Sequence, residues 1–183
     1  MFEPLHKKLA SHSELLLGVW DVVVYGSAVR GKSKPRDIDI AVLMAGKIIA
    51  SKKLYLAQQF RKNLGGDVKV VDLDDFLNPG FLARQAILAE GYSLLKKDYL
   101  AERFGYSALA LITYTLKSLP LSKQKLLYYA LQGRKRGTGV LAKLGGKIIG
   151  KSLLAVPTKH FEKLKDLLQQ HQVEFETSFT LQY

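Results

Sequence analysis

Two pairs of residues in the first forty positions have the types and spacing needed to handle a phosphorylated substrate. Gly26 and Ser27 follow an apolar run, and Asp37 and Asp39 open the next one. Because side chains i and i+2 of a β-strand point to the same face, Asp37 and Asp39 would present two carboxylates side by side. Two such carboxylates repel each other unless a cation lies between them, and Mg²⁺ binds one or two carboxylates together with substrate phosphates. The pair therefore predicts a metal site.

The Gly-Ser pair has the properties of a phosphate-binding turn. Gly26 lets backbone amides approach a phosphate because it has no Cβ, and Ser27 adds a hydroxyl donor. Arg30 follows shortly after, in a basic segment that extends to Arg36. Hydrogen-bond donors for a phosphate on one side and metal-binding carboxylates on the other predict phosphoryl or nucleotidyl transfer.

The surrounding sequence predicts a strand before each of these features. Residues 19–25 form a β-branched, nearly continuous apolar run, which is typical of a strand buried on both faces. The patterns further predict strands over 37–44 and 67–73 and helices over 3–17, 51–64 (with Ser51 as the N-cap) and 79–90. Asp72 lies near the end of the third predicted strand.

The second half has a different composition. Its patterns predict two long helices over 98–118 and 121–133, a strand over 152–156, a helix over 158–170 and a strand over 174–182. We therefore divide the chain into a catalytic domain (1–98) and a basic C-terminal domain or elaboration (99–183). The predicted fold class is α/β (α+β), with a small mixed sheet flanked by helices and then a basic helical and α+β segment.

Two segments together resemble a known family. Residues 22–43 (VVVYGSAVRGKSKPRDIDIAVL) resemble the signature of minimal nucleotidyltransferases of the DNA polymerase beta-like superfamily: a strand, Gly-Ser, about ten residues and Asp-x-Asp. Residues 70–95 (VVDLDDFLNPGFLARQAILAEGYSLL) resemble that family's third-carboxylate strand and the helix after it, which ends in Glu-Gly. The resemblance covers roughly residues 18–97 and predicts the fold of that superfamily.

The resemblance implies an enzyme that moves a nucleoside monophosphate, AMP by default, from a nucleoside triphosphate to a hydroxyl on a macromolecule. Asp37 and Asp39 would hold two Mg²⁺ ions, and Asp72 would complete the site as a metal ligand or as the base. Asp74 is the alternative to Asp72, because alternation places both on one face. Asp72 is preferred because it follows two valines inside the apolar run.

The resemblance further implies that Gly26 and Ser27 hold the β- and γ-phosphates, with assistance from Arg30. The sequence departs from the family's pattern in two places. Nine residues separate Ser27 from Asp37, where the family usually has ten, and Arg36 stands where Ser is common. A guanidinium at this point would either bind phosphate or weaken metal binding.

The net charge of +12 is concentrated in the second half. Residues 1–100 carry +4 and residues 101–183 carry +8, and the window 103–161 holds 11 Lys or Arg and no Asp or Glu. Such a field attracts phosphate chains, so this window predicts RNA or another polyanion as partner, with a solvated basic surface as the alternative. Tyr106, Tyr114, Tyr128 and Tyr129 are expected in the core rather than stacked on bases.

Composition also narrows the function classes. The chain has no Cys, so it has no disulfide, no thiolate zinc site and no cysteine nucleophile, and we expect a cytoplasmic protein. No apolar stretch reaches the about 20 residues needed to span a bilayer, so no membrane partner is predicted. Two alternative functions stay open: an antitoxin-type protein adenylyltransferase acting on a helical toxin, and a non-catalytic nucleic-acid-binding module with a vestigial site.

Overall fold

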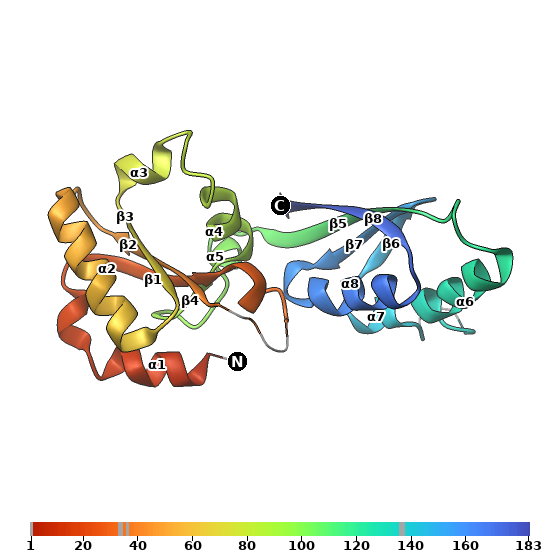
Figure 1. Cartoon of the computed structure of the whole chain (residues 1–183), viewed down its shortest axis with the longest axis horizontal. Coiled ribbons are helices and arrows are strands. Elements are labelled where there is room, and N and C mark those ends of the chain that lie inside the picture. Colours follow the sequence, from red (N-terminus) through yellow and green to blue (C-terminus); the bar gives the residue numbers. More distant parts are fainter. Residues whose placement is uncertain (1, 33–34, 36, 136–137) are drawn as a thin grey trace. The chain divides into compact units, whose positions relative to one another are not determined.

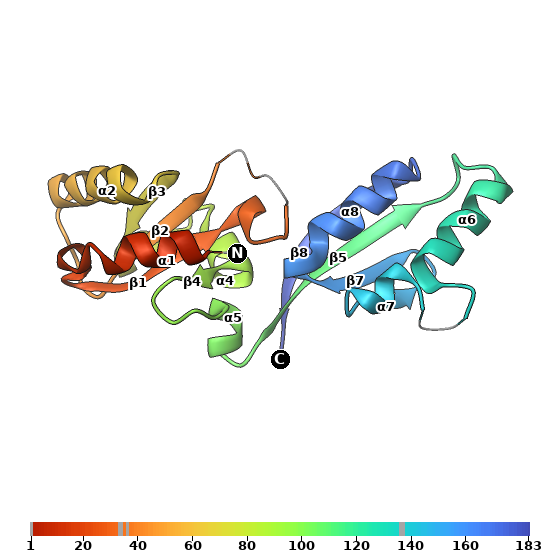
Figure 2. The ribbon, with the colours of Figure 1, turned by 90° about the horizontal axis from the view of Figure 1, so that it is seen from below.

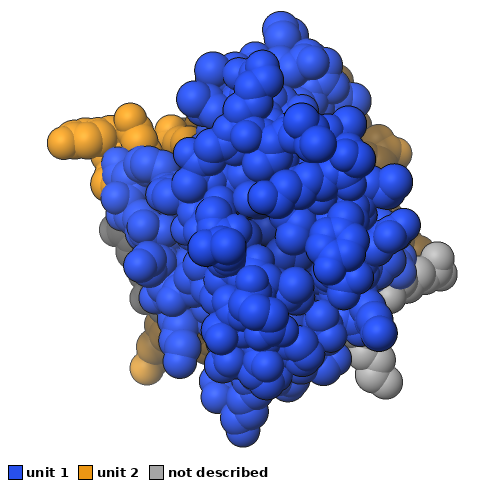
Figure 3. All heavy atoms as spheres, turned by 90° about the vertical axis from the view of Figure 1, so that its left-hand side faces the viewer, with its two compact units in different colours: residues 1–29, 33–104 blue, residues 30–32, 105–183 orange. Residues whose placement is uncertain are grey.

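The chain folds into two compact units, each with its own sheet and core. The computed structural model describes residues 2–32, 35, 37–135 and 138–183. Unit 1 comprises residues 1–29 and 33–104, and unit 2 comprises residues 30–32 and 105–183. Figure 3 colours the two units separately. Unit 1 thus ends at Phe104, six residues beyond the division after residue 98 that the sequence suggested.

Unit 1 is built on a four-stranded mixed sheet with the strand order β3-β2-β1-β4 (Figure 1). β1 (Val19–Tyr25) pairs antiparallel with both β2 (Asp39–Met44) and β4 (Tyr92–Ser93). β3 (Asp67–Val71) pairs parallel with β2 and is one of the two edge strands, with β4 at the other edge. The small mixed sheet predicted from the sequence is confirmed.

Both faces of this sheet are buried, as the continuous apolar run of β1 predicts. One face packs against α1 (Glu3–Ala10) and α2 (Ala50–Leu64). The residues that bury this face include Val22, Val24, Ile40, Val42 and Val68 of the strands and Leu9, Leu56 and Phe60 of the helices. The opposite face packs against α4 (Arg84–Glu90) and α5 (Leu100–Arg103), through Val23, Tyr25, Ala41, Leu43, Val71, Ile87 and Leu100.

Several predicted boundaries in unit 1 shift. The predicted helix over 3–17 divides into α1 and the 3₁₀ turn η1 (Ser13–Leu16). Ser51 is not the N-cap of α2, because the helix begins one residue earlier, after Ile49. β3 ends at Val71 because Asp72 caps the short helix α3 (Leu73–Leu77).

Unit 2 is a four-stranded antiparallel sheet with the order β6-β7-β5-β8. Its elements are β5 (Ser107–Thr115), α6 (Leu121–Gln132), α7 (Val140–Lys143), β6 (Lys147–Gly150), β7 (Leu153–Pro157), η3 (Thr158–His160), α8 (Phe161–Gln170) and β8 (Glu174–Gln182). Apart from the extra short helix α7, this succession and strand order are those of a split βαβ, or ferredoxin-like, motif. Figures 1 and 2 show that α6, α7 and α8 all lie on one side of the sheet.

The largest error in the predicted secondary structure is the helix over 98–118. Residues 100–103 form the short helix α5, and residues 107–115 form β5, the strand between β7 and β8. A short apolar run cannot be assigned to a buried helix or a buried strand by periodicity alone. Here β7 and β8 pair with the two edges of this segment, and this pairing makes it a strand. β6 was also missed, whereas β8 and α6 are confirmed.

No helix among the described residues is long and apolar enough to cross a membrane.

Candidate functional site

The closest approach in the site joins Gly26 and Asp39. Asp39 is the first residue of β2 and pairs with Tyr25, the last residue of β1, so the following Gly26 lies beside the Asp39 side chain. A Cβ built on Gly26 would lie 2.6 Å from Oδ2 of Asp39, and φ of Gly26 is +76°. Both the space and the backbone conformation therefore require glycine at this position.

Ser27 lies in the turn that begins at Gly26. Gly26–Ala28 form the 3₁₀ turn η2, closed by a hydrogen bond from the Val29 N–H to the Gly26 carbonyl at 3.1 Å. Gly26 and Ala28 are buried, and Ser27 is half-buried. The structure thus brings together three of the residues predicted from the sequence: Gly26, Ser27 and Asp39.

Asp37 lies two residues before Asp39 and is exposed. Ile38, between the two, packs against the core on the α1/α2 side, and its carbonyl accepts the Asp67 N–H at 2.9 Å. Asp39, the first residue of β2, therefore belongs to the opposite face, whereas Asp37 lies at a bend before the strand begins. The predicted pairing of the two carboxylates stays a prediction.

Asp72 does not join this pair. The register of β2 and β3 sets Asp39 opposite Asp67, and Asp72 lies five residues farther along, about 16 Å in extended chain. Its carboxylate is 2% exposed and accepts hydrogen bonds from Lys53 Nζ at 2.8 Å, from the Asp75 N–H at 3.1 Å and from the Ile48 N–H at 3.3 Å. The third-carboxylate role that the resemblance implied does not fit this position.

The chemistry around Asp72 is that of a structural cap. Asp72 and Asp75 form a capping box at the start of α3, in which each side chain accepts the other's backbone N–H. The hydrogen bond from Lys53, followed by the one from the Asp75 N–H, holds the pKa of Asp72 well below its usual value. Asp74, the alternative in the sequence, lies within α3 and forms an exposed ion pair with Lys47 at 2.7 Å. Both carboxylates belong to the far end of the sheet.

β3 instead places Asp67 and Lys69 on the face of the site. Asp67 pairs with Asp39, and Lys69 pairs with Ala41, so alternation gives both the same face as Asp39. Asp67 has a half-exposed side chain that accepts a hydrogen bond from Arg61 at 3.2 Å. Neither residue was singled out from the sequence, because the register between two parallel strands is set by tertiary pairing.

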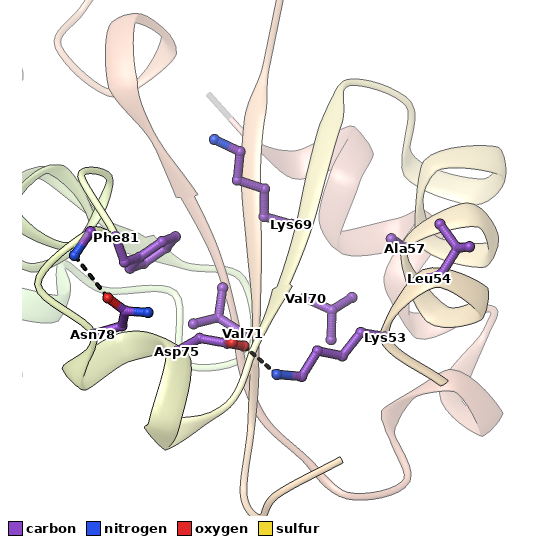
Figure 4. Close-up of a pocket in the computed structure, with 10 residues that line it drawn as sticks. Lys53, Leu54, Ala57, Lys69, Val70, Val71, Asp75, Asn78 and Phe81 are labelled. Atoms are coloured by element: carbon purple, nitrogen blue, oxygen red, sulfur yellow. Dashed lines mark hydrogen bonds and ion pairs between the residues drawn. The ribbon is translucent and has the colours of Figure 1, made fainter. Parts of the chain in front are cut away.

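Figure 4 shows the pocket that β3 forms with α2 and the segment after α3. It has a volume of about 520 Å³ and is lined by Lys53, Leu54, Ala57, Lys69, Val70, Val71, Asp75, Asn78, Gly80 and Phe81. Lys53 forms ion pairs with both Asp72 and Asp75. Lys69 points away from Lys53 and Asp75 (Figure 4). Lys69 is the exposed cation on the strand that carries Asp67.

Tyr25 reports the electrostatic environment of the carboxylates. Burial, then the negative charges of Asp39 and Asp67, raise the pKa of Tyr25 to about 12. The shift has the sign expected for a phenol near anions, which disfavour a further negative charge. Tyr25 is a neutral phenol at physiological pH, as a tyrosine with an ordinary pKa near 10 would also be.

Arg30 is placed among the side chains of unit 2. Its Nε lies 3.4 Å from Oε1 of Glu162, its guanidinium lies 5.5 Å from the centre of the Phe179 ring, and its carbonyl accepts the Glu162 N–H at 3.2 Å. The predicted contact of Arg30 with a phosphate at Ser27 stays a prediction. Arg36, the other arginine discussed in the sequence, lies outside the described residues.

The match to a family model decides the identity of this site. The model described as "Polymerase beta, Nucleotidyltransferase" matches residues 7–100, which is half of the chain. The chain belongs to the polymerase beta nucleotidyltransferase family. It is therefore a nucleotidyltransferase, and the matched residues include Gly26, Ser27, Asp37 and Asp39.

Similar solved structures come from toxin–antitoxin complexes. A tri-AMPylated Shewanella oneidensis HEPN toxin in complex with MNT antitoxin gives 26% identity over 51% of this chain and 71% of the matched chain, with a TM-score of 0.37. A toxin–antitoxin with AMP-PNP gives 29% identity over 49% of this chain and 71% of the other, also at 0.37. No curated protein matches the chain.

The donor set of this nucleotidyltransferase fits a divalent cation that arrives with a nucleotide. Among the described residues, no three His, Asp or Glu side chains are grouped closely enough to hold a metal ion by themselves. Mg²⁺ commonly binds through one or two carboxylates, with substrate phosphates and water as its remaining ligands. Asp37 and Asp39 meet that requirement, whereas the predicted set of three aspartates does not form in this structure.

Proposed function

We propose that unit 1 transfers a nucleoside monophosphate, with AMP as the first candidate, from a nucleoside triphosphate to a hydroxyl group on a macromolecule. The observation that carries this proposal is the approach of Gly26 to Oδ2 of Asp39. A backbone without a side chain, a hydroxyl at Ser27 and the carboxylates Asp37 and Asp39 converge on one end of the sheet. This combination suits a metal-bound triphosphate.

Each residue has a role that follows from its position. Asp37 and Asp39 would hold Mg²⁺, which when bound would neutralise charge on the triphosphate and polarise its phosphorus centres. Ser27 would donate a hydrogen bond to a phosphate oxygen, and the bare Gly26 backbone would allow that phosphate to come close. Tyr25, held neutral, would not add to the negative charge that the substrate must approach.

The reaction itself is an in-line displacement. The acceptor hydroxyl oxygen forms a bond to the α-phosphorus, the bond from the α-phosphorus to the bridging oxygen breaks, and pyrophosphate leaves with the bonding electrons. The proton of the hydroxyl must pass to a base or to water. We assign that proton-accepting role to Asp67, because β3 places it directly opposite Asp39. To act, its side chain must turn away from Arg61.

Lys69 adds a positive charge to the same face. A cation near the triphosphate stabilises the negative charge that builds up on the leaving pyrophosphate. Lys69 is exposed and lies one residue pair farther along β3 than Asp67. We therefore assign to Lys69 a contact with the phosphates, a position that the sequence patterns did not mark.

RNA is the acceptor that the charge of unit 2 favours. The window 103–161 contains 11 Lys or Arg and no acidic residue, and most of it belongs to unit 2. Such a surface binds phosphate backbones with little regard for sequence. We expect its affinity for RNA to fall about 10- to 100-fold between low and physiological salt, and to be unchanged by substitutions at Asp37 and Asp39.

The decisive experiment is transfer of label from α-³²P-labelled ATP, CTP, GTP and UTP in the presence of Mg²⁺. Total RNA and a cell lysate serve as acceptors, and the double variant Asp37→Asn/Asp39→Asn is the control. Label on RNA that disappears in the double variant supports the proposal. Label on a protein would support the transferase activity but identify the acceptor as a polypeptide, as for an adenylylating antitoxin. No transfer, with RNA binding intact in both proteins, would leave only a binding module.

A further inference from the structure

The sheet of unit 2 has one face that no helix of the described residues covers. Ala110 and Ile112 of β5 and Leu154 and Val156 of β7 lie in the core with the three helices. Because side chains alternate along a strand, the residues between them point to the opposite face. That open face is defined here by four register rows, each written from β8 through β5 and β7 toward β6: Thr180-Leu109-Pro157, Ser178-Leu111-Ala155-Lys147, Glu176-Thr113-Leu153 and Glu174-Thr115.

The centre of the open face is aliphatic. Leu109 and Leu111 of β5 and Leu153 and Pro157 of β7 form it, and Ile149, in the bulge of β6, is 52% exposed beside them. A shallow pocket of about 530 Å³ lies over Leu109, Leu111 and Ile149. An exposed apolar centre framed by polar residues is typical of an interaction surface.

The open face is poorly suited to RNA. Sheets of this type that bind RNA do so through aromatic side chains on the two central strands, which stack on bases. The register gives the central strands β5 and β7 only Leu, Thr, Ala and Pro on this face. The aromatic residues Phe175 and Phe179 of β8 pack instead against the helical core.

The two edges of the open face carry opposite charges. Glu174 and Glu176 lie on β8, and Lys147 lies on β6 at the other edge, one register row away from Glu176. All three side chains are exposed, and none has an ion-pair partner within the described part of the chain. Unit 2 is strongly basic as a whole, and Glu174 and Glu176 place negative charge on one edge of this face.

We propose that the open face of unit 2 binds the same face of a second copy of the chain. A two-fold axis parallel to the strands, placed between β5 and β7, lays β8 of one copy over β6 of the other. The acidic edge of each copy then faces the basic edge of its partner, and the two aliphatic centres meet. A two-fold interface requires such a self-complementary surface.

The size of the face predicts a weak dimer. β5 and β8 have nine residues each, whereas β7 has five and β6 has four. At about 3.3 Å per residue and about 4.8 Å between strands, the flat area is about 400 Å² per copy, below the about 800 Å² of a standard interface. We therefore expect a dissociation constant of about 10–100 µM, which decreases in salt-free buffer because the edge pairs are exposed.

Sedimentation velocity on the full chain, from about 5 to about 500 µM, tests the proposal. Lys147→Glu and Glu176→Lys should each raise the dissociation constant about tenfold, because each places like charges at the facing edges. The double variant Lys147→Glu/Glu176→Lys should return it to within about threefold of the wild-type value. The double variant can restore dimerisation only if the β6 edge of one copy faces the β8 edge of the other.

Two controls separate the interface from folding and from net charge. Leu111→Glu should abolish the dimer, whereas Leu126→Glu on the helical side, at a leucine that is 60% exposed, should not. Lys125→Glu on α6 reverses an exposed charge away from the face and should leave the dimer unchanged. Circular dichroism melts verify that each variant is folded.

The proposal is overturned by any of three results. The chain remains monomeric at every concentration, the dimer is insensitive to Leu111→Glu, or the double charge exchange fails to restore what the single variants lose. RNA binding that is lost in Leu111→Glu but kept in Leu126→Glu would reassign the face to nucleic acid.

Discussion

The two ends of the sheet in unit 1 both carry aspartates, and they serve different purposes. At one end, Asp39 lies against the backbone of Gly26, and burial, together with the negative charges of Asp39 and Asp67, raises the pKa of Tyr25 to about 12. At the other end, Asp72 is surrounded by Lys53 and two backbone N–H groups, which lower its pKa. A carboxylate whose acceptor capacity is already filled by its own fold has little left for a metal. The comparison therefore separates the end that we propose to be catalytic from a structural end.

The largest effect is expected at the catalytic end. Asp39→Asn should reduce nucleotidyl transfer by about 1000-fold, because the proposed metal site would lose one of its two carboxylates. The free energy of unfolding should change little. Label transfer and urea denaturation of the same preparation check both statements. Residual activity within tenfold of wild type would remove Asp39 from the metal site.

A glycine substitution tests the close approach by itself. In Gly26→Ala the new Cβ would meet Oδ2 of Asp39 at 2.6 Å, so we expect transfer to fall about 100-fold. The matched control is Gly65→Ala, where φ is +79° against +76° at Gly26 and no atom lies within 4 Å of the added Cβ. Both variants should lose at least about 1 kcal/mol of stability, because both place a side chain at positive φ. Only Gly26→Ala should lose activity. Equal losses of activity in the two variants would show that the contact between Gly26 and Asp39 has no specific role in transfer.

At the structural end we expect a loss of stability without a loss of chemistry. Asp72→Asn keeps an N-cap but removes the charge that Lys53 faces, and should lower the free energy of unfolding by about 1–2 kcal/mol. Transfer should stay within about threefold of wild type when measured below the unfolding transition. A 100-fold loss of transfer would return Asp72 to the catalytic site.

The same variant has a pH signature. The pKa of Asp72 is lower in the folded state, so its contribution to stability is complete above the unfolded value near 3.9 and is lost as pH falls through the folded value. The stability difference between wild type and Asp72→Asn should therefore be constant from about pH 7 to 5 and shrink below about pH 4. Urea denaturation across this range measures it. A difference that grows on acidification would contradict the assignment.

The smallest effect is expected for Asp74→Asn. Asp74 and Lys47 form an ion pair whose side chains are 63% and 82% exposed, and such pairs contribute little to stability. Neither the urea midpoint nor the transfer rate should change measurably. A clear loss of transfer in this variant, with Asp72→Asn unaffected, would identify Asp74 as the functional carboxylate.

Local sequence patterns were sufficient for much of the catalytic end. Residues 19–25 read as a doubly buried strand because β-branched residues fill both faces, and β1 has those bounds. The Gly-Ser pair and the second aspartate of the Asp-x-Asp motif marked residues that the structure brings together, because each feature depends on a few consecutive residues. The same holds for β8 and α6 in unit 2.

Only the tertiary structure decided which carboxylate faces Asp39. Alternation along the chain relates Asp72 to Asp74, but the distance between Asp39 and Asp72 depends on the register of two parallel strands joined by a helix. Register is set by packing between strands that are distant in the chain, so it cannot be deduced from a few consecutive residues. The strand β5 was missed for the same reason, since its pairing partners lie about forty and seventy residues later in the chain. The sequence by itself determined which groups can do chemistry, and the pairing of distant strands decided which of them meet.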